Sequence, residues 1–298
     1  MEKAVAIRAP AKINLGLTVL RRRPDGYHDL LSVMQQLSLA DTLLLEPHRE
    51  PGWRFFCSEP ALSGEDNLVC RAAALLAEKA GQRRPLPGVK ISLFKSIPVA
   101  AGLGGGSSDA AAALKGLNSF WGLGLSLAEL LELGAALGSD VPYCLLGGTA
   151  LVQGRGEKVA SLPALPFHWV VLALPPGLQL STAQVYAALN PGLFMSPRLE
   201  PLIAAVRERS RRALRLWFAG GATNTLEAAV LPQQPPLQAL KRLFLELGLH
   251  PAMSGSGPSL FALCDSLPQA RAAARALEEA GNRAFLCWTI SHVHERKE

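Results

Sequence analysis

Alternating hydrophobic and polar residues predict short strands in the first half of the chain. Turn residues separate these runs, and the last of them alternates like a half-buried strand. The predicted strands cover residues 5–8, 13–19, 42–46, 53–57 and 89–94. Between and after them, apolar residues recur at helical spacing. Asp66 is the expected N-cap of a helix that ends at Gly81, and Ser126 with Glu129 forms a capping box for a helix that ends at Gly138.

The second half mixes the same two patterns. Strands are expected over residues 169–173, 260–264 and 284–290, and helices over 199–214, 237–247 and 269–280. Residues 147–156 are rich in turn formers and are followed by Pro163 and Pro166, so we place a domain boundary there. The expected domains are 1–160 and 161–298. Strands and helices that alternate without βαβ regularity predict an α+β fold with two layers per domain.

Composition excludes several classes of protein. The chain has 298 residues, of which 49% are hydrophobic and 18% charged, so it is neither disordered nor of low complexity. No apolar run reaches the roughly 18 residues that span a bilayer, and the apolar start is too short for a signal peptide. We therefore expect a cytoplasmic protein with no membrane partner. The five cysteines show no metal-ligand spacing, so we expect reduced thiols and no zinc site.

The formal net charge of +6 favours an anionic partner without choosing among phosphorylated metabolites, lipid headgroups and nucleic acid. The basic runs are residues 21–23 and 207–212. Both lack the interleaved aromatic residues on which bases stack, so the sequence does not favour a nucleic-acid partner. An RNA-binding protein remains the alternative from another class.

The most specific segment is a glycine-rich loop that follows the strand predicted at 89–94. Such a loop, leading into the N-terminus of a helix expected over residues 108–118, forms a cradle for a phosphate group. It lacks the lysine of a P-loop and fails the dinucleotide pattern at Ser107. Ser107 and Ser108 have three possible roles: to cap the helix, to bind a phosphate oxygen or to help hold Mg²⁺. The loop consists of Pro98, Val99, Ala100, Ala101, Gly102, Leu103, Gly104, Gly105, Gly106, Ser107 and Ser108.

This loop resembles the second motif of the GHMP small-molecule kinases, where it binds the phosphates of ATP. Two more segments agree in order, PAKINL at residues 10–15 and MSGSGP at 253–258. The resemblance covers essentially the whole chain. It implies an N-terminal domain like domain 2 of ribosomal protein S5, a C-terminal ferredoxin-like α/β sandwich and an active site in the cleft between them. It also implies ATP, delivered with Mg²⁺, as the phosphoryl donor.

Further motifs resemble one branch of this family. PDGYH at residues 24–28, EDNL at 65–68 and GSDVP at 138–142 are similar to the kinases that phosphorylate the 2-hydroxyl of CDP-linked methylerythritol in the non-mevalonate isoprenoid pathway. Homoserine and mevalonate kinases share the glycine loop but are not expected to carry DGYH. A nucleotide sensor without catalysis is disfavoured because Lys12 and Asp140 are both present. The oligomeric state stays open.

The resemblance also implies roles for single residues. Lys12 and Asp140 are the expected catalytic pair: Asp140 accepts or orients the proton of the acceptor hydroxyl, and Lys12 keeps Asp140 ionised and neutralises the transferring phosphoryl group. The acceptor pocket is expected to include Asn14, Tyr27, His28 and Tyr186, with the rings holding the cytosine. Asn67 and Lys95 are expected beside the adenine end of ATP, with a first-turn helix position for Asn67 and a solvated charge at the end of a strand for Lys95 as the alternatives. The stretch Asn224-Thr225-Leu226-Glu227 departs from the Asn-Asp common in the family and receives no role.

Overall fold

The computed structural model describes residues 4–81, 86–221 and 223–291. The chain divides into two compact units that interleave along the sequence. The first comprises residues 1–11, 40–98 and 104–146, and the second comprises 12–39, 99–103 and 147–298. Strands β1 (Val5–Arg22) and β2 (His28–His48) contribute residues to both units. The domain boundary near residue 160 stays a prediction.

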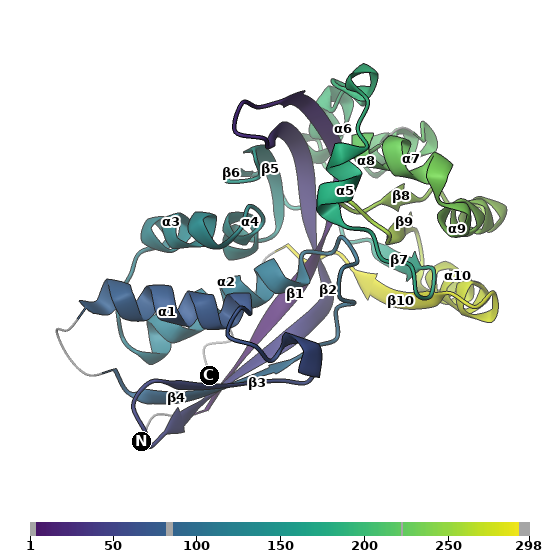
Figure 1. Cartoon of the computed structure of the whole chain (residues 1–298). Coiled ribbons are helices and arrows are strands. Elements are labelled where there is room, and N and C mark those ends of the chain that lie inside the picture. The colour runs from purple at the N-terminus through teal and green to yellow at the C-terminus, as the bar shows by residue number, and fades with distance from the viewer. Residues whose placement is uncertain (1–3, 82–85, 222, 292–298) are drawn as a thin grey trace. The chain divides into compact units, whose positions relative to one another are not determined.

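The first unit consists of helices packed on a sheet. Residues 42–48 of β2 pair antiparallel with β4 (Gly88–Phe94), which pairs in parallel with β3 (Trp53–Cys57). The helices lie on one face of these strands (Figure 1). Gly116 shows how close α2 comes, because a Cβ there would lie 2.1 Å from Ile7 Cδ1 and 2.9 Å from Leu45 Cδ1. The helical elements are η1 (Pro60–Leu62), α1 (Leu68–Ala80), α2 (Gly105–Phe120), α3 (Leu127–Leu137) and α4 (Val141–Leu146).

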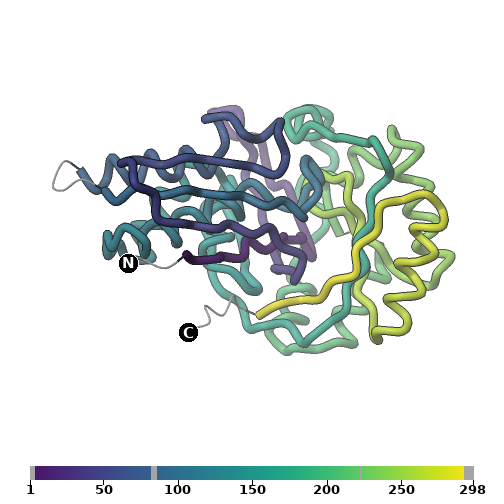
Figure 2. Tube along the Cα trace, turned by 90° about the horizontal axis from the view of Figure 1, so that it is seen from below, coloured from purple at the N-terminus to yellow at the C-terminus, as the bar shows by residue number. Residues whose placement is uncertain are grey.

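The second unit contains two groups of paired strands. Residues 30–35 of β2 pair antiparallel with β5 (Thr149–Gly154), and β5 pairs antiparallel with β6 (Lys158–Ser161). A separate antiparallel sheet has the order β10-β7-β9-β8. Figure 2 shows its edge strand β10, in yellow, running beside β7. The strands of this sheet are β7 (Trp169–Leu174), β8 (Ala252–Met253), β9 (Leu260–Cys264) and β10 (Arg283–Trp288).

Helices cover that sheet and bury its apolar side chains. The core of the unit draws residues from β1, β7 and β9 and from the helices after them, with Phe244 and Leu260 fully buried. The β1 backbone joins this core directly, because the Leu17 amide donates to the Thr223 carbonyl at 2.9 Å. The helical elements are α5 (Thr182–Ala187), η3 (Pro191–Leu193), α6 (Glu200–Arg207), α7 (Arg211–Ala219), α8 (Thr225–Val230), η4 (Leu231–Gln233), α9 (Pro235–Glu246) and α10 (Leu267–Glu279).

The structure confirms several sequence predictions and corrects others. The strand at 260–264 and the Ser126–Glu129 capping box are as predicted. The N-cap of α1 is Asn67 rather than Asp66. The runs at 5–8 and 13–19 form one strand. The helix predicted over 199–214 is instead two helices, because Arg209 adopts a φ of 53° and Ser210 caps a new helix.

The five cysteines are free and buried. Burial raises the pKa of the Cys70 and Cys264 thiols to about 11, so both carry their proton at neutral pH. In the part of the chain that the structure describes, no helix combines the length and the apolar character required to cross a membrane.

Candidate active site

A buried lysine of the second unit is hydrogen-bonded to a neighbouring amide. Lys12 is on β1 with only 4% of its surface exposed, and its Nζ donates to Asn14 Oδ1 at 2.9 Å. The amide of Asn14 is oriented in turn, because its Nδ2 donates to Ser32 Oγ at 2.8 Å and Ser32 Oγ donates to the Gly16 carbonyl at 2.7 Å. This chain of hydrogen bonds fixes the amide oxygen toward the ammonium.

A glycine loop covers this lysine. A Cβ on Gly255, whose φ is 55°, would lie 3.1 Å from Lys12 Nζ, so only glycine lets the backbone approach this closely. The same loop meets the phosphate-loop segment, because Ser254 Oγ donates to the Gly102 carbonyl at 3.0 Å. The Lys12 amide donates to the Leu103 carbonyl at 2.9 Å. Three segments far apart in the sequence therefore meet at Lys12.

The phosphate loop ends in an uncapped helix. Gly104 is the N-cap of α2 with a φ of 68°, and as a glycine it has no side chain to accept from the first-turn amides. Such amides, at the positive end of a 16-residue helix, are a site for an anion. The helix begins three residues earlier than the predicted start at Ser108. Ser107 and Ser108 therefore lie inside the first turn rather than at its cap.

Lys95 lies in a buried ion cluster rather than at a solvated strand end. Its Nζ pairs with Asp109 Oδ2 at 2.6 Å and with Asp41, and only 5% of its side chain is exposed. Asp41 also accepts from the amides of Ser96 and Ile97, at 2.5 Å and 2.8 Å. The cluster ties Lys95, directly after β4, to Asp109 near the start of α2. Its function toward ATP stays a prediction.

Two carboxylates, Asp41 and Asp109, share the Lys95 ammonium of this cluster. Burial and the neighbouring Asp41 raise the pKa of Asp109 to about 7, against the opposing effect of Lys95. Asp41 accepts from two backbone amides, whereas Asp109 Oδ1 is buried without a hydrogen-bond partner among the described residues. Asp109 is therefore the group that takes up a proton near neutral pH.

Asn67 has a structural role as the N-cap of α1. Its Oδ1 accepts from the Val69 amide at 2.9 Å and its Nδ2 donates to the Leu62 carbonyl at 2.8 Å. The two helix starts are close, because a Cβ on Gly106 would lie 3.8 Å from Leu68 Cδ1. Asn67 is thus next to the phosphate loop, while a contact with adenine stays a prediction.

Aromatic rings gather beside the β1–β2 turn. The His28 and Tyr186 ring centroids lie 5.1 Å apart, and Phe194 approaches His28 edge-on at 6.1 Å. The pKa of His28 is lowered by burial and by Arg22, which favours a neutral imidazole. Tyr27 is 54% exposed, and the Arg155 guanidinium lies 4.9 Å from its ring centroid. The sequence did not indicate Phe194 or Arg155, because neither belongs to a motif.

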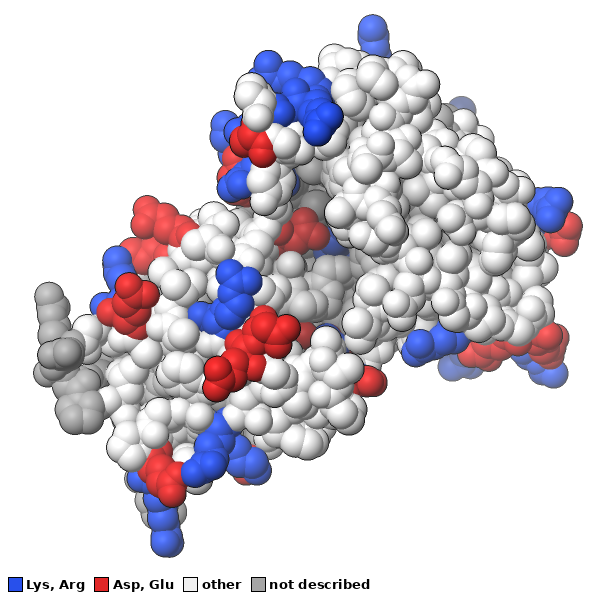
Figure 3. Space-filling view, viewed as in Figure 1, with Lys and Arg blue, Asp and Glu red and all other residues white. Residues whose placement is uncertain are grey.

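Basic side chains gather over this turn, as Figure 3 shows. Two of the three consecutive arginines are already paired with acids of the same hairpin. Arg23 binds Asp25 and Asp29, and Arg21 binds Asp29 at 2.7 Å. These hydrogen bonds lower the pKa of both carboxyls. The turn therefore presents a fixed network of charges.

Asp140 belongs to the first unit and directly precedes α4. Its carbonyl accepts from the Cys144 amide at 3.0 Å, and its side chain is half-buried. Tyr143 lies three residues further on, in α4. Burial raises the pKa of its hydroxyl, with further contributions from Cys144 and Asp140. Because Lys12 belongs to the second unit, the pairing of these two residues stays a prediction.

Comparison with known proteins identifies the family. The family model for the N-terminal domain of GHMP kinases matches residues 67–148, and the model for their C-terminal domain matches residues 199–283. The chain belongs to the GHMP kinases. This GHMP kinase is 44% identical over 292 residues to the Moorella thermoacetica protein named 4-diphosphocytidyl-2-C-methyl-D-erythritol kinase, covering 96% of this chain and 99% of that one.

Solved structures agree with the α+β fold of this GHMP kinase. A crystal structure of 4-(cytidine 5'-diphospho)-2C-methyl-D-erythritol kinase superimposes with a TM-score of 0.80 at 38% identity, covering 96% of this chain and 99% of that chain. Homoserine kinase from Cytophaga hutchinsonii gives a TM-score of 0.75 at 20% identity, covering 98% and 96%. The second likeness concerns the fold alone. The family expected from the sequence is thus confirmed.

Proposed function

We propose that this chain transfers the γ-phosphoryl group of ATP to the 2-hydroxyl of 4-diphosphocytidyl-2-C-methyl-D-erythritol, a step of the non-mevalonate isoprenoid pathway. The observation that carries this proposal is the likeness, over 96% of the chain, to a relative named for that reaction. The DGYH motif at residues 25–28 supports the same acceptor.

The phosphate loop would bind the triphosphate of ATP. The N-cap of α2 is a glycine, which has no side chain to cover the first-turn amides, and residues 98–108 supply backbone that glycine allows to approach a ligand. Mg²⁺ would arrive with ATP and neutralise charge on the phosphates. The hydroxyls of Ser107 and Ser108, in that first turn, are the protein groups that we expect to contact the ion or a phosphate oxygen.

Phosphoryl transfer requires positive charge where the negative charge develops and an acceptor hydroxyl held in line. Lys12 supplies the charge, at an ammonium that Asn14 holds in place. Asp140 accepts or orients the proton of the acceptor hydroxyl. Removing that carboxylate leaves the phosphate loop intact, so ATP binding is expected to survive in Asp140→Asn while kcat falls by several orders of magnitude.

The aromatic cluster would bind the cytosine end of the acceptor. Tyr186 and Tyr27 provide ring surface, and the neutral imidazole of His28 offers one donor and one acceptor. Asn14 would contact the methylerythritol end. The partners proposed are thus two small molecules. Nucleic acid is not among them, because the basic runs at 21–23 and 207–212 lack the interleaved aromatic residues on which bases stack.

A panel of acceptors tests this function. Purified protein with MgATP is given CDP-methylerythritol, homoserine or mevalonate, and ADP release is measured in a coupled assay. We expect turnover with CDP-methylerythritol alone. Turnover with homoserine or mevalonate at a comparable kcat/KM would reject the acceptor, and salt-dependent RNA binding that ATP does not affect would favour the other class of function.

A further inference from the structure

We propose that Asn224 and Glu227 are positioning residues that hold the glycine loop 253–257 over Lys12. Both come from the segment to which the sequence assigned no role. The inference rests on the proposed function, because it assigns a task to the loop above the expected catalytic lysine. Neither residue is required to touch a substrate.

Asn224 binds the loop through both hydrogens of its amide. Nδ2 donates to the Met253 carbonyl at 2.8 Å and to the Gly255 carbonyl at 2.9 Å. Its Oδ1 accepts from the Leu226 amide at 2.8 Å and so caps α8. The side chain is buried, and each of these bonds forms away from solvent. One residue thus joins the start of α8 to two carbonyls of the loop.

Glu227 holds the same loop through the backbone amide of Met253. Its Oε2 accepts from the Met253 amide at 2.8 Å, so the N–H and the C=O of Met253 are both bound by side chains of this segment. The second carboxylate oxygen, Oε1, pairs with Lys241 of α9. The carboxylate is buried, and this pairing keeps its charge compensated.

The loop contacts the surroundings of Lys12, so its position affects the lysine. Ser254 Oγ donates to the Gly102 carbonyl at 3.0 Å, and Gly255 packs directly on the lysine ammonium. Asn224 also lies beside the strand that carries the lysine, because it forms a parallel bridge with Leu17. A loop released from Asn224 would therefore move the surface that fixes both Lys12 Nζ and the phosphate-loop segment.

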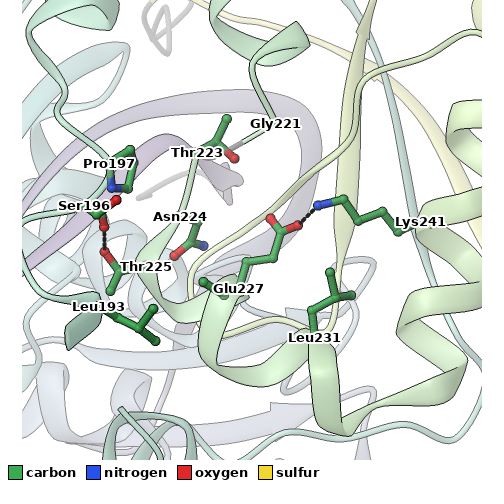
Figure 4. Close-up of a pocket in the computed structure, with 11 residues that line it drawn as sticks. Leu193, Ser196, Pro197, Gly221, Thr223, Asn224, Thr225, Glu227, Leu231 and Lys241 are labelled. Atoms are coloured by element: carbon green, nitrogen blue, oxygen red, sulfur yellow. Dashed lines mark hydrogen bonds and ion pairs between the residues drawn. The ribbon is translucent and has the colours of Figure 1, made fainter. Parts of the chain in front are cut away.

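Asn224 and Glu227 form part of the wall of a pocket of about 240 Å³. Figure 4 shows Glu227 reaching from α8 toward Lys241, with Asn224 beside it. The Lys241 side chain is 21% exposed, so the ion pair lies at the edge of solvent, whereas the bond to Met253 is buried. The bond to Met253 is therefore the one that holds the loop, and the ion pair supports it from outside.

The decisive variant is Asn224→Ser. Serine remains a good N-cap, so α8 keeps its acceptor, but the side chain is too short to donate to Met253 and Gly255. We expect kcat with CDP-methylerythritol to fall at least about tenfold, with KM for the acceptor changed less than threefold, because the released loop displaces Lys12, whose charge is proposed to act in the transition state. The matched control is Asn190→Ser, which alters an exposed N-cap whose side chain accepts from the Gly192 amide in η3.

Two substitutions of Glu227 separate the effect of its bond to Met253 from that of its ion pair with Lys241. Glu227→Gln keeps an acceptor for the Met253 amide and loses the ion pair, so we expect turnover within threefold of wild type. Glu227→Leu loses both, and we expect a fall like that of Asn224→Ser. Melting temperatures and circular dichroism at the assay temperature measure the folded fraction of each variant. A loss of kcat that matches the loss of folded protein would overturn the proposal, as would near-normal turnover of Asn224→Ser.

Amide hydrogen exchange tests whether Asn224 holds the loop, and it requires no phosphoryl-acceptor substrate. We expect the amides of residues 254–257 to exchange faster in Asn224→Ser than in wild type, while those of α10 are unchanged. Equal exchange in the loop overturns the proposal. If wild type itself turns over no CDP-methylerythritol, the proposed function fails instead, and the exchange data still decide whether Asn224 holds the loop.

Discussion

Lys12 Nζ donates a 2.9 Å hydrogen bond to Asn14 Oδ1, two residues along the same strand. Side chains two apart on a strand point to the same face, so β1 alone brings the ammonium and the amide together. Ser32 on β2 fixes the amide by accepting from its Nδ2. The geometry of the lysine is therefore set by backbone pairing and by two polar side chains, before any substrate binds.

Lys12→Met is expected to separate catalysis from stability. Methionine fills similar space and removes the ammonium, so kcat should fall at least about a hundredfold, as when one charge-stabilising group is lost from an active site. The melting temperature should stay the same or rise, because burying an ammonium costs desolvation. Steady-state kinetics and thermal unfolding measure the two effects. A kcat within threefold of wild type would remove Lys12 from the chemistry.

Gly102→Ala tests how tightly the two glycine loops pack. The backbone there has a φ of 75°, and an added Cβ would lie 2.2 Å from the Ser254 carbonyl oxygen. We expect kcat/KM for ATP to fall at least about tenfold, because one of the two loops must shift. Gly248→Ala is the matched control: its φ is 71° with no atom within 4 Å of the new Cβ, so it should cost only about 1 kcal/mol of unfolding free energy. Equal effects of the two variants would contradict tight packing.

The sequence predicted the elements whose signals are local. The capping box at Ser126 and Glu129 and the strand at 260–264 depend on neighbours a few residues away, and both are confirmed. The break between α6 and α7 escaped prediction, because a φ of 53° at Arg209 leaves no mark in the apolar pattern. The motifs also located the glycine loop, although its helix begins at Gly105.

The parts of the site that the sequence could not predict depend on long-range contacts. Lys95 reads as a charge at the end of a strand, and only the fold brings it to Asp41, 54 residues away. Asn224 has the same pattern as any N-cap, and its bonds to a loop about 30 residues further on follow from tertiary packing. Neither contact has a periodic or local signal. The catalytic pairing of Lys12 with Asp140 remains a prediction.

We expect Tyr186 to bind the CDP-linked acceptor through its aromatic ring. Its centroid lies 5.1 Å from that of His28. Because stacking an aromatic side chain on a base contributes about 1–3 kcal/mol, Tyr186→Ala should raise KM for the CDP-linked acceptor roughly tenfold. Tyr186→Phe should stay within about twofold, and KM for ATP should change in neither variant. An equally large effect of Tyr186→Phe would assign the binding to the hydroxyl instead.

The cluster of Asp41, Lys95 and Asp109 makes the stability of the protein depend on pH. Burial raises the pKa of Asp109 to about 7, against 3.8 for a free aspartate. Between these values the folded chain binds a proton that the unfolded chain has released. The contribution of Asp109 to the unfolding free energy is therefore full below about pH 4 and is lost as the pH rises to about 7.

Asp109→Asn isolates this contribution, because it removes the titrating group and keeps an oxygen acceptor for Lys95. From pH 5 to pH 8 we expect the melting temperature of wild type to fall relative to that of the variant, since wild type must bury a second carboxylate charge as it loses its proton. Thermal unfolding at matched ionic strength measures the difference. Asp265→Asn is the control, because Asp265 pairs with Arg215 on the surface, and its difference from wild type should change less over the same range. A wild type that gains stability over Asp109→Asn toward pH 8 would mean that Lys95 dominates and keeps Asp109 ionised throughout.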